Sequence, residues 1–244
     1  MQAANPHRSA AAEGQRTQST KPDEFLHPTY FLDCDHPAIR EFAIERTAAA
    51  KSDIEKAIAL FYAVRDEIRY DPYSFELAPA HFRASQTLKQ KFGWCVTKSA
   101  LMAALCRACG IPARVGYADV RNHLTSPKLM ELMQSEVFIF HGYVEIWLEQ
   151  RWVKATPVFD RRLCDRFGVV AQEFDGRADS LFQQFDASGR KHMEYVNDRG
   201  VYDDIPHCEI IAEMGIAYPR LITFAEGKPQ QKGFSGAVPD AFTA

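Results

Sequence analysis

A cysteine at the start of a predicted helix is the feature of this sequence with the clearest potential for chemistry. Gly93 interrupts the chain two residues before Cys95, and an apolar stretch with few charges follows as far as Cys109. Because the first turn of a helix has unpaired amide N–H groups and a partial positive charge, a thiolate is favoured there. In such positions the pKa of a thiol falls from ~8.5 towards ~3.5–7.5. Cys95 is therefore a candidate nucleophile.

The predicted helix has a well-marked end. Gly110 can adopt the left-handed conformation that follows a last turn, and Pro112 prevents continuation. Cys106 and Cys109 lie inside the helix, where a cysteine usually serves as a small apolar residue. Their C-x-x-C spacing is a poor zinc signal because no second pair matches it. We expect no metal and no cofactor.

A nucleophilic thiol needs a base within hydrogen-bond reach, and His141 is the best candidate. Of the eight histidines, it alone lies in an apolar β-prone run, residues 138–147. Strand alternation places it on one face with Tyr143 and Glu145. A single strand histidine is more often a satisfied core imidazole. The order along the chain favours a catalytic pair instead, since a helix-start cysteine is followed by a strand and then by the strand with the histidine.

The elements that must position these residues follow from local patterns. Residues 137–148 and 151–157 are predicted to form a hairpin joined at Glu149 and Gln150, although this turn lacks the usual Gly or Asn. A second hairpin is expected from residues 181–185 and 192–196, and a single strand from residues 113–120. Helices are predicted over residues 37–47, 52–69, 85–91, 127–133, 160–167 and 205–214.

Length and composition indicate one sizeable core. With 244 residues, 46% of them hydrophobic, we expect one domain over residues 23–225, a disordered segment over 1–22 and a loose tail over 226–244. The net charge of -3 gives no reason to expect nucleic acid or an acidic membrane as partner. Six cysteines are too few for a disulfide scaffold, and no secretory or long apolar segment is recognisable. A cytoplasmic protein with free thiols is expected.

Several motifs together resemble the core of the transglutaminase-like superfamily of papain-like thiol enzymes. They are Gly93-Trp94-Cys95, residues 110–115, and the strand 141–147 followed by Arg151-Trp152-Val153. The resemblance covers roughly residues 54–160. It implies an α+β fold in which a buried helix bearing the cysteine packs on an antiparallel sheet that supplies a histidine and an acid. It also implies acyl transfer from peptides or amides, with Cys95 as nucleophile and His141 as general base.

The third catalytic group departs from the family's pattern. Where the family usually has an acid just beyond the tryptophan strand, this chain has Thr156, which can accept a hydrogen bond from imidazole but carries no charge. Asp160 follows four residues later and is our first candidate, with Thr156 as the alternative. Asp160 is also a preferred N-cap for the helix predicted after it. A later acid such as Asp175 stays open.

Two further roles complete the predicted site. An oxyanion needs hydrogen-bond donors, and the candidates are the Cys95 amide and the side chains of Tyr70, Gln86 and Gln90, each of which is more often a surface or packing residue. Trp94 is expected to wall the cleft, although plain core packing is the simpler role. Together these residues predict a thiol-dependent peptide or amide hydrolase or acyltransferase. The alternative is a non-catalytic binding or scaffolding domain, which the missing acid at Thr156 favours.

Overall fold

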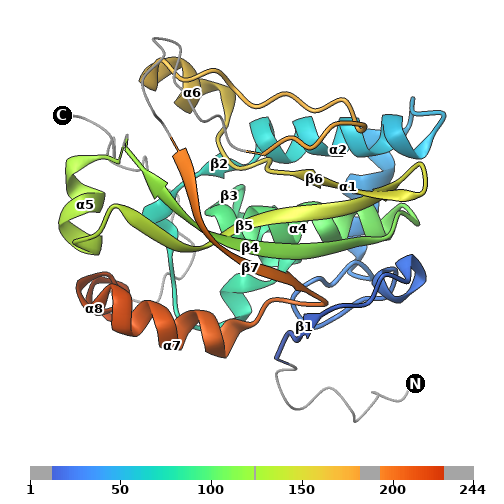
Figure 1. The fold of residues 1–244 in the computed structure, drawn as a ribbon. Helices are drawn as coiled ribbons and strands as arrows, with labels where there is room; N and C mark the ends of the chain where they lie inside the picture. The colour runs from blue at the N-terminus through green and yellow to red at the C-terminus, as the bar shows by residue number, and fades with distance from the viewer. Residues whose placement is uncertain (1–12, 124, 182–192, 228–244) are drawn as a thin grey trace.

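An antiparallel sheet forms the centre of the protein (Figure 1). The computed structural model describes residues 13–123, 125–181 and 193–227. The strand order in this five-stranded sheet is β1-β7-β4-β5-β6, and each neighbouring pair runs antiparallel. The strands are β1 (Arg16–Thr17), β4 (Ala113–Asn122), β5 (Val137–Leu148), β6 (Arg151–Ala155) and β7 (Met193–Tyr202), with β2 (Arg69–Tyr70) and β3 (Phe92–Gly93) forming a separate parallel pair.

Helix α4 (Cys95–Ala108) lies behind the sheet and packs against β5 and β4 (Figure 1). Three other helices pack on α4: α1 (Pro37–Thr47), α2 (Asp53–Glu67) and α3 (Ala84–Gln90). The remaining helices are α5 (Pro127–Met133), α6 (Arg161–Phe167), α7 (His207–Ala217) and α8 (Pro219–Glu226), with short 3-10 turns at Pro22–Phe25, Pro72–Ser74 and Pro79–Phe82. The predicted α+β arrangement, a buried cysteine-bearing helix on an antiparallel sheet, is confirmed.

The central helix is buried all round, as its composition predicts. Every residue from Cys95 to Arg107 is buried, and Gly110 beyond the last turn has a φ of 75°. At the start, the Thr97 hydroxyl oxygen accepts the N–H of Trp94 at 3.1 Å, which satisfies an amide that precedes the first turn. The helix therefore begins at Cys95 itself.

One charged residue of this helix is held by backbone carbonyls. Lys98 has no exposed surface, and its Nζ donates to the carbonyl oxygens of Arg65 at 3.1 Å and Ile68 at 2.5 Å. These carbonyls lie at the C-terminal end of α2, where the helix leaves acceptors without intrahelical partners. Burial lowers the pKa of Lys98 to about 7. The contact fixes the start of α4 against the end of α2.

The β5–β6 hairpin turns in the two residues that the sequence predicts. Glu149 and Gln150 have φ values of 47° and 66°, as a type I′ turn requires, even without Gly or Asn. The pairs closest to the turn are Leu148 with Arg151 and Trp147 with Trp152. The second strand ends at Ala155, two residues earlier than predicted, and lies opposite Val144.

The chain ends differ from the sequence prediction where the structure describes them. Within residues 13–22, predicted to be disordered, Arg16 and Thr17 pair with β7, and the Ser19 carbonyl accepts a hydrogen bond from Arg114. This correction has a local cause, since β7 otherwise lies at the edge of the sheet. Residues 1–12, most of the predicted tail, and most of the first strand of the second predicted hairpin lie outside the described residues. No helix in the described ranges is long and apolar enough to cross a membrane.

Candidate active site

Cys95 lies at an apolar pocket. The thiol-bearing residue is 6% exposed and occupies the first position of α4. The pocket is bounded by β2, by the residue before α4, by α5, by the start of β5 and by the junction of α7 and α8. The lining residues from these elements are Tyr70, Trp94, Leu129, Met133, Phe138 and Tyr218. Trp94 packs edge-on against Phe75 and Phe82, so it is both a cleft wall and part of the core. The predicted position of Cys95 at the start of the helix is confirmed.

Strand β5 approaches the first turn of α4 closely at Gly142. The pairing of β6 with β5 ends at Val144, two residues after Gly142. The Gly142 amide is one of the backbone groups that lower the pKa of the Cys95 thiol. A side chain at position 142 would not fit, since a Cβ there would lie 2.9 Å from the Cys95 carbonyl oxygen and 3.0 Å from the Val96 Cα. The close approach of β5 to the first turn of α4 therefore requires glycine at this position.

The environment of the thiol acts on its pKa in two directions. Burial raises the pKa of Cys95 to about 11, while the backbone N–H groups of Gly142, Val96 and Cys95 lower it. The sequence led us to expect a lowered pKa, and this expectation is wrong for the protein without substrate. The N–H groups are present as predicted, but loss of water around a nearly inaccessible sulfur outweighs them.

His141 precedes Gly142 in the same strand and is 1% exposed. It pairs with Ala118 of β4 and shares a side of the pleated strand with Tyr143. Its ring lies 6.5 Å from the ring of Phe159, which in turn packs edge-on against Tyr70 at 4.9 Å. Tyr70 lines the Cys95 pocket, so two ring contacts lead from His141 to the residues around the thiol.

The residue before the histidine has an unusual backbone. Phe140 has a φ of 53°, and the register between β4 and β5 shifts at this point. Its N–H donates to the Asp119 carboxylate at 3.1 Å, and the Arg199 guanidinium lies 4.0 Å from the centre of its ring. Arg199 also forms ion pairs with Asp119 and Glu213. A phenylalanine whose backbone is in the left-handed region is strained, and these contacts hold Phe140 in that conformation.

The two candidates for the third group have different partners. Asp160 accepts the N–H of Tyr70 and the N–H of Leu163, both at 3.0 Å, so it is the N-cap of α6. Thr156 is buried, and its hydroxyl makes no hydrogen bond with any residue that the structure describes. The later acid Asp175 accepts the N–H groups of Arg177 and Ala178 in a turn.

The predicted oxyanion candidates separate in the structure. Tyr70 lines the Cys95 pocket. Gln86 lies instead along a surface hollow between α1 and α3, and Gln90 donates to the Phe92 carbonyl at 2.8 Å. The C-x-x-C pair is also separated from the site, since Cys106 is buried in α4 and Cys109 contacts Thr47. Tyr70 is the candidate that the fold brings to the thiol.

A comparison with known families decides the identity of this core. The family model described as "Transglutaminase-like superfamily" matches residues 40–157, which contain Cys95, His141 and Thr156. Over these residues, just under half of the chain, the protein matches the transglutaminase-like superfamily. The resemblance first seen in short motifs therefore extends from α1 to the end of β6. Asp160 lies just beyond the matched residues.

Solved structures with a similar arrangement are distant from this transglutaminase-like chain. A predicted cysteine protease from Cytophaga hutchinsonii is 17% identical, with a TM-score of 0.44, over 75% of this chain and 54% of its own. The periplasmic domain of TgpA from Pseudomonas aeruginosa is 23% identical, with a TM-score of 0.40, over 57% of this chain and 48% of its own. This chain thus spans about half the length of each. No curated protein matches it.

Sequence reasoning did not find every residue around the thiol. Asp119 lies in a strand where it reads as an ordinary alternating polar residue, and its contact with Phe140 depends on the shifted pairing of three strands. Gly142 carried a clearer signal, because a glycine inside a long β-prone run often marks a close backbone approach.

Proposed function

We propose that this protein is a thiol-dependent peptide or amide hydrolase or acyltransferase, with Cys95 as nucleophile and His141 as general base. One close approach carries the proposal: the backbone of Gly142, the residue directly after His141, lies against the first turn of α4, so that a Cβ there would be 2.9 Å from the Cys95 carbonyl oxygen. The match of residues 40–157 to the transglutaminase-like superfamily supports the same roles. The substrate is then an acyl group of a peptide or amide.

The reaction follows from these roles. His141 removes the proton from the Cys95 thiol as the sulfur attacks the acyl carbon, which forms a C–S bond and a tetrahedral oxyanion. When the C–N bond breaks, the imidazolium returns the proton to the leaving amine. Water or an amine then attacks the thioester, with His141 again taking a proton, and the Cys95 thiol is released. Since burial raises the pKa of Cys95, we propose that ionisation accompanies substrate binding.

Asp160 remains our first candidate for orienting His141, with Thr156 as the alternative. Each Asp160 oxygen accepts one backbone N–H, and a carboxylate has further acceptor capacity on both oxygens. Thr156 has a buried hydroxyl that could accept an imidazole N–H. For the oxyanion we propose the Cys95 amide together with the Tyr70 hydroxyl, because Tyr70 lines the pocket and Gln86 and Gln90 do not.

A second candidate function is a non-catalytic binding or scaffolding domain. Two observations favour it: burial raises the pKa of Cys95, and the usual acid position holds Thr156. A neutral thiol without a charged orienting group is a poor nucleophile. The two functions differ in whether Cys95 can become acylated.

Acylation by an activated ester such as p-nitrophenyl acetate separates the two functions. We expect an acetyl thioester on Cys95, detected by mass spectrometry, and none in Cys95→Ala. Loss of the general base in His141→Ala should slow acylation by about 10²–10⁴-fold. The matched control is Cys208→Ser, because Cys208 is exposed on α7 and should not matter. An unmodified Cys95, or equal rates in wild type and a folded His141→Ala variant, supports the scaffolding function.

A further inference from the structure

A hollow next to the thiol pocket has the features of a substrate subsite. It has a cavity volume of about 60 Å³ and is partly open to solvent. It shares Tyr70, Pro72, Leu129 and Phe138 with the Cys95 pocket. A group bound in this hollow would therefore be continuous with a group held at the thiol.

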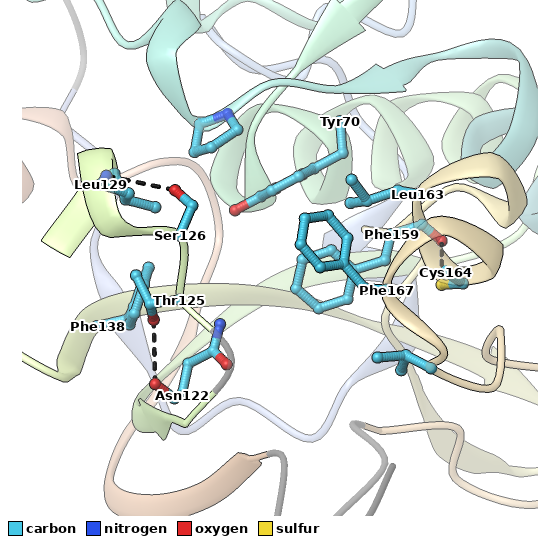
Figure 2. A pocket seen from close by; sticks show the side chains of 12 residues that line it. Tyr70, Asn122, Thr125, Ser126, Leu129, Phe138, Phe159, Leu163, Cys164 and Phe167 are labelled. Carbon is cyan, nitrogen blue, oxygen red and sulfur yellow. Dashed lines mark hydrogen bonds between the residues drawn. The ribbon is translucent and has the colours of Figure 1, made fainter. Parts of the chain in front are cut away.

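Aromatic and aliphatic side chains make up most of its wall. Figure 2 shows the rings of Phe159 and Phe167 beside each other, with Leu163 above them. Ser126 and Leu129 of the α5 start lie on the opposite side, and the Tyr70 ring extends between the two sides. An aromatic ring placed among these side chains would gain offset or edge contacts as well as burial.

The polar groups of the wall are uncharged and largely engaged with the protein. The Ser126 hydroxyl accepts the Leu129 N–H at 3.3 Å and lies 2.8 Å from the Tyr73 hydroxyl, while Thr125 donates to the Asn122 carbonyl at 3.0 Å. Among the residues that the structure describes, none that lines the hollow has a Lys, Arg, Asp, Glu or His side chain. A charged substrate group would lose its hydration there without gaining an ion pair.

We propose that this hollow binds an uncharged apolar side chain of the acyl substrate, with aromatic side chains preferred. The proposal rests on the proposed function, since it makes the hollow the specificity pocket of the Cys95 reaction. Its occupant is a phenylalanine-like or leucine-like group next to the acyl carbon. Acidic and basic side chains are excluded by the cost of burying an unpaired charge.

A panel of N-acetyl amino acid p-nitrophenyl esters tests this specificity through the rate of Cys95 acylation. The side chains compared are those of Phe, Leu, Gly, Lys and Glu. We expect the Phe and Leu esters to react at least about tenfold faster than the Gly ester, as expected for a hydrophobic pocket. The Lys and Glu esters should be no faster than the Gly ester. Equal rates for all five esters would overturn the proposal.

Substitutions at the end of α6 test whether the preference for apolar esters arises in this hollow. Phe167→Asp places a carboxylate in the hollow, so the Phe-to-Gly rate ratio should fall at least tenfold and the Lys ester should gain. Val170→Asp is the matched control, because Val170 is 50% exposed nearby and does not line the hollow. An unchanged Phe-to-Gly ratio in Phe167→Asp, or an equal fall in Val170→Asp, contradicts the assignment.

Equilibrium binding separates failure of this pocket from failure of the catalytic function. N-acetyl-phenylalaninamide and N-acetyl-lysinamide are titrated against Cys95→Ala by NMR or calorimetry. One outcome is that wild type is never acylated, but the phenylalanine amide binds more tightly than the lysine amide and Phe167→Asp weakens its binding. The hollow is then an apolar binding site in a protein without the proposed activity. If neither amide binds, or both bind equally, the pocket assignment is wrong whatever the fate of the thiol.

Discussion

At the residue scale, the raised pKa of Cys95 determines how the thiol reacts with pH. The ordinary thiol value is 9.0, and burial raises the pKa to about 11, so the thiolate fraction at neutral pH is about a hundredfold smaller than for an ordinary thiol. Alkylation of Cys95 by iodoacetamide should therefore increase about tenfold per pH unit between pH 7 and 10. At pH 7.5 it should be slower than alkylation of exposed Cys208. A rate that levels off below pH 8 would indicate a low-pKa thiolate and contradict this account.

Gly142 offers a second test at this scale. A Cβ there would lie within 3.0 Å of backbone atoms of Cys95 and Val96, which cannot rotate away. Gly142→Ala should lower the free energy of unfolding by about 1–3 kcal/mol, the usual effect of overpacking, and separate β5 from the thiol. The matched control is Gly215→Ala in α7, where a Cβ meets nothing within 4 Å and alanine favours the helix. Equal stability of Gly142→Ala and wild type in urea denaturation would show that the approach is not tight.

At the element scale, the shifted register of β5 depends on Asp119. This carboxylate accepts the Phe140 N–H and pairs with Arg199, which is mostly buried. Asp119→Ala leaves both groups without that partner, so we expect a loss of about 2–4 kcal/mol in unfolding free energy. Asp119→Asn keeps an acceptor and should lose less. Urea denaturation gives the ranking, and a loss in Asp119→Ala no larger than in Asp119→Asn would argue against the role of this contact.

The sequence predicts the elements better than their pairing. The 3.6-residue apolar pattern and Gly110 define the cysteine helix, and two β-prone runs separated by two residues define the β5–β6 hairpin. These signals are local. The left-handed Phe140 depends on the register of β4 with two neighbours, and β1 depends on an open edge of β7, so neither could be read from a single segment.

In the candidate site, too, the sequence predicts local features but not those that depend on how distant segments pack together. A helix-start position predicted the amide groups around Cys95 but not the burial that raises the pKa of its thiol, because burial depends on α5, α8 and β5 together. Asp160 had two competing sequence roles, and the structure places its carboxylate on the N–H groups of Tyr70 and Leu163. Its part in catalysis stays a prediction, as do the cytoplasmic location and the absence of nucleic acid and membrane partners.

At the scale of the whole molecule, buried Lys98 should affect the dependence of stability on pH. Burial lowers the pKa of Lys98 from 10.5 to about 7, so between these values the unfolded chain binds more protons than the folded protein. The contribution of Lys98 to the free energy of unfolding should then rise with pH from about 7 upwards, by up to about 1.4 kcal/mol per pH unit. Below pH 7 both states are protonated and this dependence should disappear.

Lys98→Met isolates this contribution. Methionine fills a similar volume without a titrating group, so between pH 6.5 and 8.5 the wild type should gain stability relative to the variant. Denaturation by urea at each pH measures the difference. A difference between wild type and Lys98→Met that stays constant over this range would mean that Lys98 is not responsible.

The most direct test of the central claim is a crystal structure of Cys95 alkylated by an N-acetyl-phenylalanine chloromethyl ketone. The measured quantity is the distance from the nearer His141 ring nitrogen to the alkylated sulfur, or to the position that the leaving amine of an acyl substrate would occupy. The account predicts an imidazole within hydrogen-bond reach, ~2.6–3.2 Å, of one of these atoms. An imidazole that stays on the Tyr143 side of β5, with the Gly142 backbone between it and the sulfur, would contradict the proposed pair.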